Sequence, residues 1–133
     1  MKQVVFALML SIIFIACMDE ATQTNEVQIT DLKEHNMKII PENPASGDQI
    51  KLVVLDDCKY NVLKGIEING KSIEIEKQYN SMIKWPCFQT NDTILIGKLS
   101  EGTYVVNYRL IDVSTQVSNH IALSFYFNLV VAQ

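Results

Sequence analysis

The stretch Ile66-Glu67-Ile68-Asn69-Gly70-Lys71-Ser72-Ile73-Glu74-Ile75-Glu76 decides the fold class of this chain. Isoleucine and glutamate alternate on both sides of Asn69-Gly70, and a period of two is typical of a half-buried strand. Asn-Gly between two such runs is the strongest short hairpin signal, because a type I′ turn needs positive φ at both central residues. The stretch therefore predicts a β-hairpin with one buried isoleucine face and one glutamate face.

Strand-like runs continue on both sides of this hairpin. They cover residues 27–30, 37–40, 50–55, 81–85, 93–96, 104–111 and 121–131. In the last run six apolar side chains share one face: Ile121, Leu123, Phe125, Phe127, Leu129 and Val131. Turn residues separate the runs, and no helical period extends along the chain. The pattern predicts an all-β, antiparallel β-sandwich of seven or eight strands, with a small up-and-down β-barrel as the alternative.

The N-terminus has the layout of a secretory signal peptide. Lys2 supplies a positive charge, residues 4–16 form an apolar run, and Cys17 follows the small residue Ala16. The run is shorter than the roughly 20 residues that a helix needs to cross the hydrocarbon core. An ordinary signal peptide with an incidental Cys17 and an uncleaved anchor remain the alternatives to a lipid-modified cysteine.

The cysteine at the cleavage point resembles the signal of bacterial lipoproteins, and Asp19-Glu20 resembles the surface-export signal of Bacteroidetes lipoproteins. The resemblance implies that residues 1–16 are removed and that Cys17 carries lipid. Residues 17–26 are then a flexible tether, and residues 27–133 are one domain. The expected location is the cell envelope, on the outer membrane, facing either the periplasm or the outside.

Charge and motif content exclude several partners. The formal net charge is −4, and without residues 1–16 ten basic residues remain against fifteen acidic ones, in no basic cluster. Such a chain is not expected to bind nucleic acid. The spacings typical of metal sites and the Gly-rich loops that hold phosphate are absent from the sequence, so we expect no metal and no cofactor.

Few residues offer catalytic chemistry. His35 lies in a polar segment and is expected to be a solvated loop residue, and His120 is expected at the start of the last strand. Asp56-Asp57 is a carboxylate pair of the kind that acid–base catalysis uses, but a solvated loop before Cys58 is the expected role. No Gly-x-Ser-x-Gly occurs. We therefore expect no catalytic residues and no enzyme activity.

Cys58 and Cys87 are the cysteines left after export, which favours a disulfide between them. Closing this loop of about 30 residues would stabilise the fold by roughly 3–4 kcal/mol. Two free buried thiols are the alternative. Tyr79, Trp85 and Phe88 surround Cys87, and exposed aromatics at this point would form a binding surface. The alternative places Trp85 in the core.

Leu99-Ser100-Glu101-Gly102-Thr103-Tyr104 fits Leu-x-x-Gly-x-Tyr and leads into a long run. It resembles the tyrosine corner of Greek-key sandwiches, in which the Tyr104 hydroxyl bonds to the backbone upstream, Gly102 makes the turn and Leu99 plugs the core. With Pro41-x-x-Pro44-x-x-Gly47-Asp48, it resembles bacterial Ig-like and fibronectin-type modules. Val106 stands where an antibody-type domain has cysteine, so antibody recognition does not transfer.

Asp92-Thr93-Ile94 matches the acceptor pattern of Bacteroidetes O-glycosylation, which makes Thr93 a candidate glycosylation site. The expected function is that of a membrane-anchored, non-catalytic binding or structural module for a protein or glycan partner. The alternative is a small envelope inhibitor of a protease or lysozyme that uses the disulfide-closed segment 58–87 as its loop.

Overall fold

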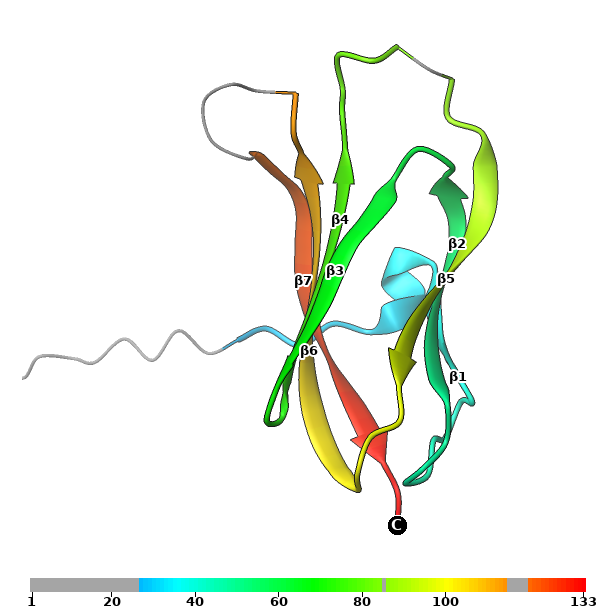
Figure 1. The fold of residues 1–133 in the computed structure, drawn as a ribbon, viewed down its shortest axis with the longest axis vertical. Helices are drawn as coiled ribbons and strands as arrows, with labels where there is room; N and C mark the ends of the chain where they lie inside the picture. The colour runs from blue at the N-terminus through cyan, green and yellow to red at the C-terminus, as the bar shows by residue number, and fades with distance from the viewer. Residues whose placement is uncertain (1–26, 85, 115–119) are drawn as a thin grey trace, which may run out of the picture.

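Two β-sheets build the part of the chain that the structure, a computed structural model, describes, namely residues 27–84, 86–114 and 120–133. The seven strands are β1 (Met37–Ile40), β2 (Ile50–Cys58), β3 (Val62–Asn69), β4 (Ser72–Tyr79), β5 (Gln89–Gly97), β6 (Gly102–Asp112) and β7 (His120–Val131). One sheet has the order β1-β2-β5 and the other β3-β4-β6-β7 (Figure 1). A single 3₁₀ turn, η1 (Leu32–His35), precedes β1.

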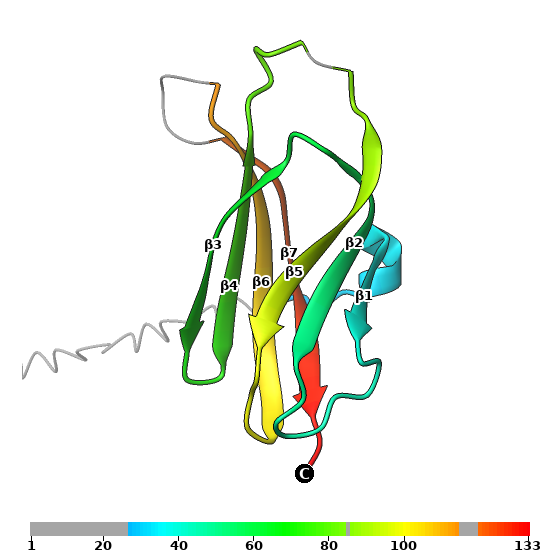
Figure 2. The same cartoon turned by 45° about the vertical axis from the view of Figure 1, so that its right-hand side comes forward.

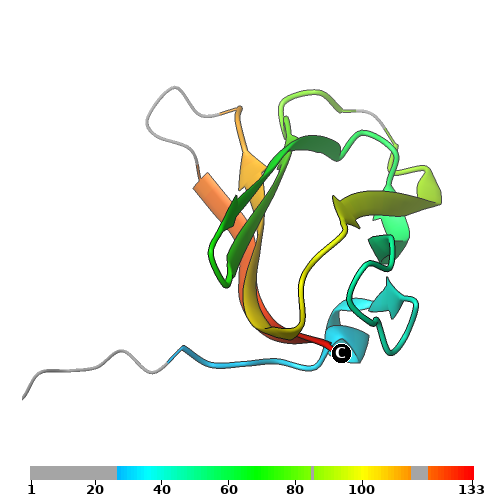
Figure 3. The ribbon, with the colours of Figure 1, turned by 60° about the horizontal axis from the view of Figure 1, so that its bottom comes forward.

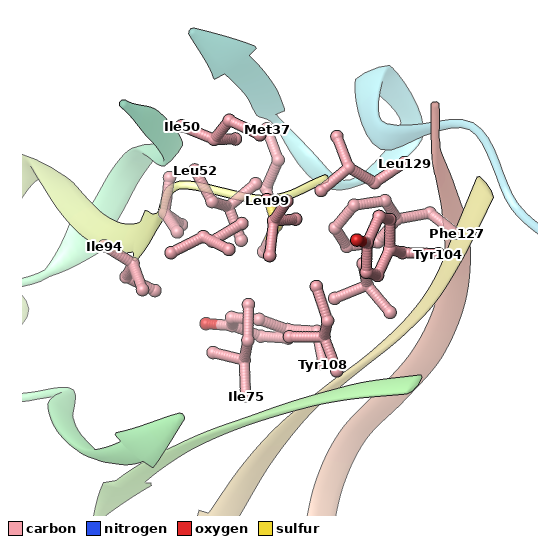
Figure 4. Close-up of a cluster of buried hydrophobic side chains, with 14 of the residues drawn as sticks. Met37, Ile50, Leu52, Ile75, Ile94, Leu99, Tyr104, Tyr108, Phe127 and Leu129 are labelled. Carbon is pink, nitrogen blue, oxygen red and sulfur yellow. The ribbon is translucent and has the colours of Figure 1, made fainter. Parts of the chain in front are cut away.

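The two sheets face each other across one apolar core, so the predicted β-sandwich is confirmed. The end-on view in Figure 3 shows the sheets on opposite sides of the interior. No strand pairing among the described residues joins the two sheets into a closed barrel. Figure 4 shows Ile75 and Tyr108 of one sheet facing Ile50, Leu52 and Ile94 of the other. All five side chains are at most 2% exposed.

The purely antiparallel pairing that the sequence suggested is wrong at one place. β4 pairs with β6 in parallel, from Ser72 opposite Val105 to Tyr79 opposite Asp112. In an Ig domain the third strand would lie beside the sixth. Here β3 is the sheet edge and β4 takes the inner position (Figure 2).

The burial of the hairpin differs between its two strands in keeping with this order. On β4, Ile73 and Ile75 are fully buried, whereas β3 carries Ile66 half-buried and Ile68 44% exposed. The inner position of β4, between β3 and β6, takes its isoleucines out of water, whereas the edge position of β3 leaves its isoleucines partly in water. The expected buried isoleucine face is therefore realised on β4 and only weakly on β3.

The hairpin turn also lies one residue further along than predicted. Asn69 pairs with Ser72, so Gly70-Lys71 is the two-residue loop. Gly70 has φ of 58°, while Lys71 is not among the described residues with positive φ. A two-residue loop that has glycine at its first position and positive φ only at that glycine is typical of a type II′ turn. A type I′ turn would need positive φ at both residues.

The segment between β4 and β5 was predicted as a strand over 81–85, and the described part of it, residues 81–84, is not in a strand. Residues 81–83 form a turn, in which the Ile83 N–H donates to the Asn80 carbonyl oxygen at 3.2 Å. The backbone leaves the sheet there because Asn80 and Ser81 offer side-chain hydrogen bonds that compete with a ladder. The Asn80 side-chain oxygen accepts from the Met82 N–H at 3.0 Å.

The entry into β6 has the geometry of a tyrosine corner. The Tyr104 hydroxyl donates to the Ser100 carbonyl oxygen at 3.0 Å. Gly102 has φ of 132°, a value that side chains rarely adopt, and Leu99 is 8% exposed in the core. The lysine of the hairpin turn, Lys71, donates to the same hydroxyl at 3.1 Å, so the corner also ties down the β3–β4 turn.

We expect Tyr104→Phe to lower the free energy of unfolding by about 1–2 kcal/mol, because it removes the hydroxyl's hydrogen bonds to the Ser100 carbonyl oxygen and to Lys71. Urea unfolding followed by circular dichroism measures the change. Tyr126→Phe is the matched control, because it removes the hydroxyl of a half-buried tyrosine on β7. It should change the free energy of unfolding by less than about 0.5 kcal/mol. Equal effects of the two variants would contradict a role for the corner.

Candidate functional site

A hollow of about 610 Å³ opens at the end of the sandwich where β2 and β4 finish. This is the upper end in Figure 1, opposite the β3–β4 turn. Three chain segments contribute to it: the β2–β3 connection, the start of the β4–β5 connection and the residue after β6. The lining consists of Cys58, Tyr60, Asn61, Val62, Gln78, Tyr79, Asn80, Ser81, Ile83, Lys84, Cys87 and Val113.

The Cys58–Cys87 disulfide forms one wall of the hollow, and its presence confirms that prediction. Cys58 ends β2, and its neighbour across the ladder is Gln89 at the start of the adjacent strand β5. The Lys59 N–H donates to the Phe88 carbonyl oxygen at 3.0 Å directly beside the bridge. The bridge is thus a local staple within one sheet, which fixes the end of the β4–β5 connection to β2.

Apolar side chains surround the hollow and remain open to water. Phe88 is 55% exposed, and its ring meets the edge of Tyr60 with ring centres 6.5 Å apart. Ile83 is 51% exposed, and Tyr79 is half-buried at the end of β4. The structure therefore brings Tyr79 and Phe88 to the same end of the sandwich, while Trp85, the third predicted aromatic, lies outside the described residues.

Asp112 anchors the start of the β4–β5 connection beside the hollow. Its carboxylate accepts the Ser81 N–H at 3.1 Å and the Ser114 N–H at 2.9 Å. The two serine hydroxyls are also bonded to each other at 2.8 Å. Hydrogen bonds from Ser81 first, and then from Ser114, hold the pKa of the Asp112 carboxyl well below its usual range, against the opposing effect of burial. One carboxylate thus joins the ends of β4 and β6.

A lowered pKa makes this anchor dependent on pH. The stabilisation is present above the unfolded pKa of 3.8 and is lost as the pH falls through the lower folded value. We expect Asp112→Asn to flatten the fall in unfolding free energy between about pH 4 and pH 2. Urea unfolding at several pH values measures this slope, with the exposed Glu101→Gln as control. A wild-type slope in Asp112→Asn would contradict the assignment.

A buried lysine, which the sequence reasoning missed, lies below the hollow. Lys77 is fully buried on β4, and its ammonium group contacts the carboxylates of Asp57 on β2 and Asp92 on β5. The expectation that Asp57 is a solvated loop residue is wrong, since it lies on β2 with 9% exposure. Its neighbour Asp56 is exposed with φ of 53°, at an irregularity in the β2–β5 pairing. This irregularity separates the two carboxylates and turns Asp57 inward.

The inward position of Lys77 could have been predicted from the sequence. Strand alternation places residues 73, 75 and 77 on one face, and Ile73 and Ile75 identify that face as the buried one. A lysine at an inward position needs a carboxylate partner, because an unpaired buried charge is costly.

The remaining candidates lie apart from the hollow. His35 is not a solvated loop residue, since its ring stacks on Phe125 with centres 3.7 Å apart and planes at 10°. His120 is exposed at the start of β7, as expected. Thr93 is exposed on β5, and its glycosylation stays a prediction. Cys17 and the signal segment lie outside the described residues.

Comparisons with known proteins leave the fold and the geometry as the basis for describing this site. No model of a protein family matches the chain, and no curated protein or solved structure matches it either. Over the described ranges, no three His, Cys, Asp or Glu side chains gather to hold a metal ion. Within the same ranges no helix has the length and apolar character needed to cross a membrane. The class defined by fold and site is thus a disulfide-stapled β-sandwich with a hollow at one end.

Proposed function

We propose that this chain is a lipid-anchored protein of the bacterial envelope whose β-sandwich binds a protein or glycan partner at the end hollow. The observation that carries the proposal is the hollow itself, with exposed apolar side chains around it at one rigid end of the fold. Binding sites are typically concave, mostly apolar and equipped with a few polar groups. The anchor rests on Cys17 and the apolar segment before it.

The chemistry of the lining suits an uncharged ligand. Asn61, Gln78 and Asn80 contribute side-chain amides, and Lys84 is the single charged residue among the described residues of the lining. Tyr60 and Tyr79 add aromatic rings, which give large contact area at low entropic cost. Rings beside amides suit either a sugar ring or an apolar side chain of a partner protein.

The hollow is built on fixed positions. The disulfide holds one side of the β4–β5 connection, and Asp112 holds the other. Loops placed by a rigid scaffold are where binding residues concentrate. The first described residues join the fold away from the hollow. The Thr30 N–H donates to the carbonyl oxygen of Tyr126, midway along β7, at 2.8 Å.

Two matched variants test the site. Ile83→Asp places a charge in the hollow, and Leu95→Asp places one on β5, where Leu95 is exposed to a similar extent (54% against 51%) outside the lining. Wild type and both variants are applied to a glycan array and cross-linked to envelope proteins in the native cell. We expect the same partner for wild type and Leu95→Asp, and at least a tenfold loss for Ile83→Asp, about 1.4 kcal/mol. Equal retention by both variants would refute the site.

For the inhibitor alternative, segment 58–87 is a hairpin flanked by two connections rather than one continuous loop. Most of the segment 58–87 is the β3–β4 hairpin, and the hairpin turn lies at the opposite end of the sandwich from the disulfide (Figure 1). The two connections that flank the hairpin, β2–β3 and β4–β5, are the parts of the segment that line the hollow, so an inhibitor would act through the same surface as the binding module.

A further inference from the structure

The buried contact between Lys77 and two carboxylates joins the two sheets of the sandwich. Lys77 belongs to the four-stranded sheet, whereas Asp57 and Asp92 belong to neighbouring strands of the other. The Lys77 side chain has no exposed surface, and that of Asp57 has 8%. The Asp92 carboxylate lies 2.5 Å from the lysine nitrogen and is 38% exposed. A primary amine and two acids are thus held in contact, with one side open to water.

The carboxyl group of Asp57 is oriented by its other oxygen. Asp57 Oδ1 accepts the Cys58 N–H at 2.9 Å and the Asn61 side-chain N–H at 2.7 Å. Asp57 Oδ2 is the atom that contacts Lys77 Nζ. Two donors on one oxygen stabilise negative charge that develops there when a nucleophile adds to the carboxyl carbon. The arrangement therefore favours attack by the amine as well as a simple ion pair.

We propose that Lys77 and Asp57 condense to a side-chain amide bond that joins β4 to β2 covalently. Asp92 takes a proton from the Lys77 ammonium group, and the freed Nζ electron pair forms a bond to the Asp57 carbon. The charge on Asp57 Oδ1 is held by Cys58 and Asn61. The Asp57 carbon–Oδ2 bond then breaks, and Oδ2 leaves as water with two protons from Nζ, relayed by Asp92. Ammonium and carboxylate become amide and water, with no other reactant.

The surroundings favour this reaction over the ion pair. Tyr108 packs nearby in the core at 2% exposure, and burial first, then the charges of Asp57 and Asp92, raise the pKa of its hydroxyl. Two charges without water are costly to keep, and condensation removes both. Holding the Lys77 amine against the Asp57 carboxyl group replaces a bimolecular encounter. The exposed side of Asp92 gives the released water a route out.

Peptide mapping of the full-length, folded protein tests the bond. After reduction and alkylation, trypsin cannot cleave at Lys77 if its amine is in an amide. The predicted product is residues 52–59 joined to residues 72–84, lighter by one water than the two separate peptides. Separate peptides 52–59 and 72–77, with no joined species, would overturn the proposal from the wild-type protein alone.

Two variants separate the chemistry from the fold. Lys77→Arg keeps a positive charge but has no amine to condense, so the joined peptide should disappear. Asp92→Asn retains the amine and Asp57 but removes the proton relay, and the joined species should form about a hundredfold more slowly. Lys98→Arg, at an exposed position after β5 and outside both peptides, should leave the joined species unchanged. Formation at the wild-type rate in Asp92→Asn would overturn the assigned role of Asp92.

Discussion

Replacing Lys77 with methionine should cost the fold about 3–5 kcal/mol, because it leaves the buried Asp57 carboxylate without its cation. Lys77 is the only fully buried charged side chain among the described residues. Methionine has a similar length, so the loss reports the missing charge rather than an empty space. If Lys77 and Asp57 are joined by an amide, the cross-link is lost as well, and the effect can only grow.

Urea unfolding of Lys77→Met measures this loss, and two further variants make it specific. Lys98→Met, at an exposed position after β5, should change stability by less than about 0.5 kcal/mol. Adding Asp57→Asn to Lys77→Met should recover part of the loss, since a neutral amide still accepts from Cys58 and Asn61. Similar small effects for Lys77→Met and Lys98→Met would show that the pair contributes little.

Removal of the disulfide is the second large effect. We expect Cys58→Ser with Cys87→Ser to lower the free energy of unfolding by about 3–4 kcal/mol, because the bridge closes a long loop in the unfolded chain. The cysteines are 29 residues apart in sequence. The bridge also holds one side of the hollow, so the double variant should bind a partner of that site less tightly.

Unfolding of the wild-type protein with and without reductant provides the control for these substitutions. Reductant should lower the stability of the wild type to that of the double-serine variant and leave the variant unchanged. A loss of less than about 1 kcal/mol in both experiments would contradict the loop-closure argument.

The local features of this chain were predictable, and the non-local ones were not. In β7 the alternation correctly identified Phe125, Phe127, Leu129 and Val131 as buried, while Ile121 is 51% exposed. Alternation is a property of each strand by itself and can be read from the sequence. The parallel pairing of β4 with β6 depends on which strand of the hairpin pairs with a strand 33 positions later in the chain, and no local pattern encodes that choice.

The site was predicted in part for the same reason. The disulfide was correctly predicted, and Tyr79 and Phe88 lie at the same end of the sandwich as the bridge because they are its neighbours in sequence. Asp112 was missed, since its partners Ser81 and Ser114 come from two different connections. The roles of Asp57 and Lys77 depend on the irregularity at Asp56 that turns one carboxylate inward, and nothing in Asp56-Asp57 distinguishes that from a solvated pair.

The envelope location in the proposed function rests on the lipid anchor at Cys17, and the mass of the intact protein purified from its native membrane tests that anchor directly. The account predicts a chain that begins at Cys17, carries covalently attached acyl groups, and gains two hydrogens on reduction of the Cys58–Cys87 bridge. A chain that starts elsewhere and carries no lipid would contradict the anchor. The protein would then be a diffusible one, and Ile83→Asp would still test binding at its hollow.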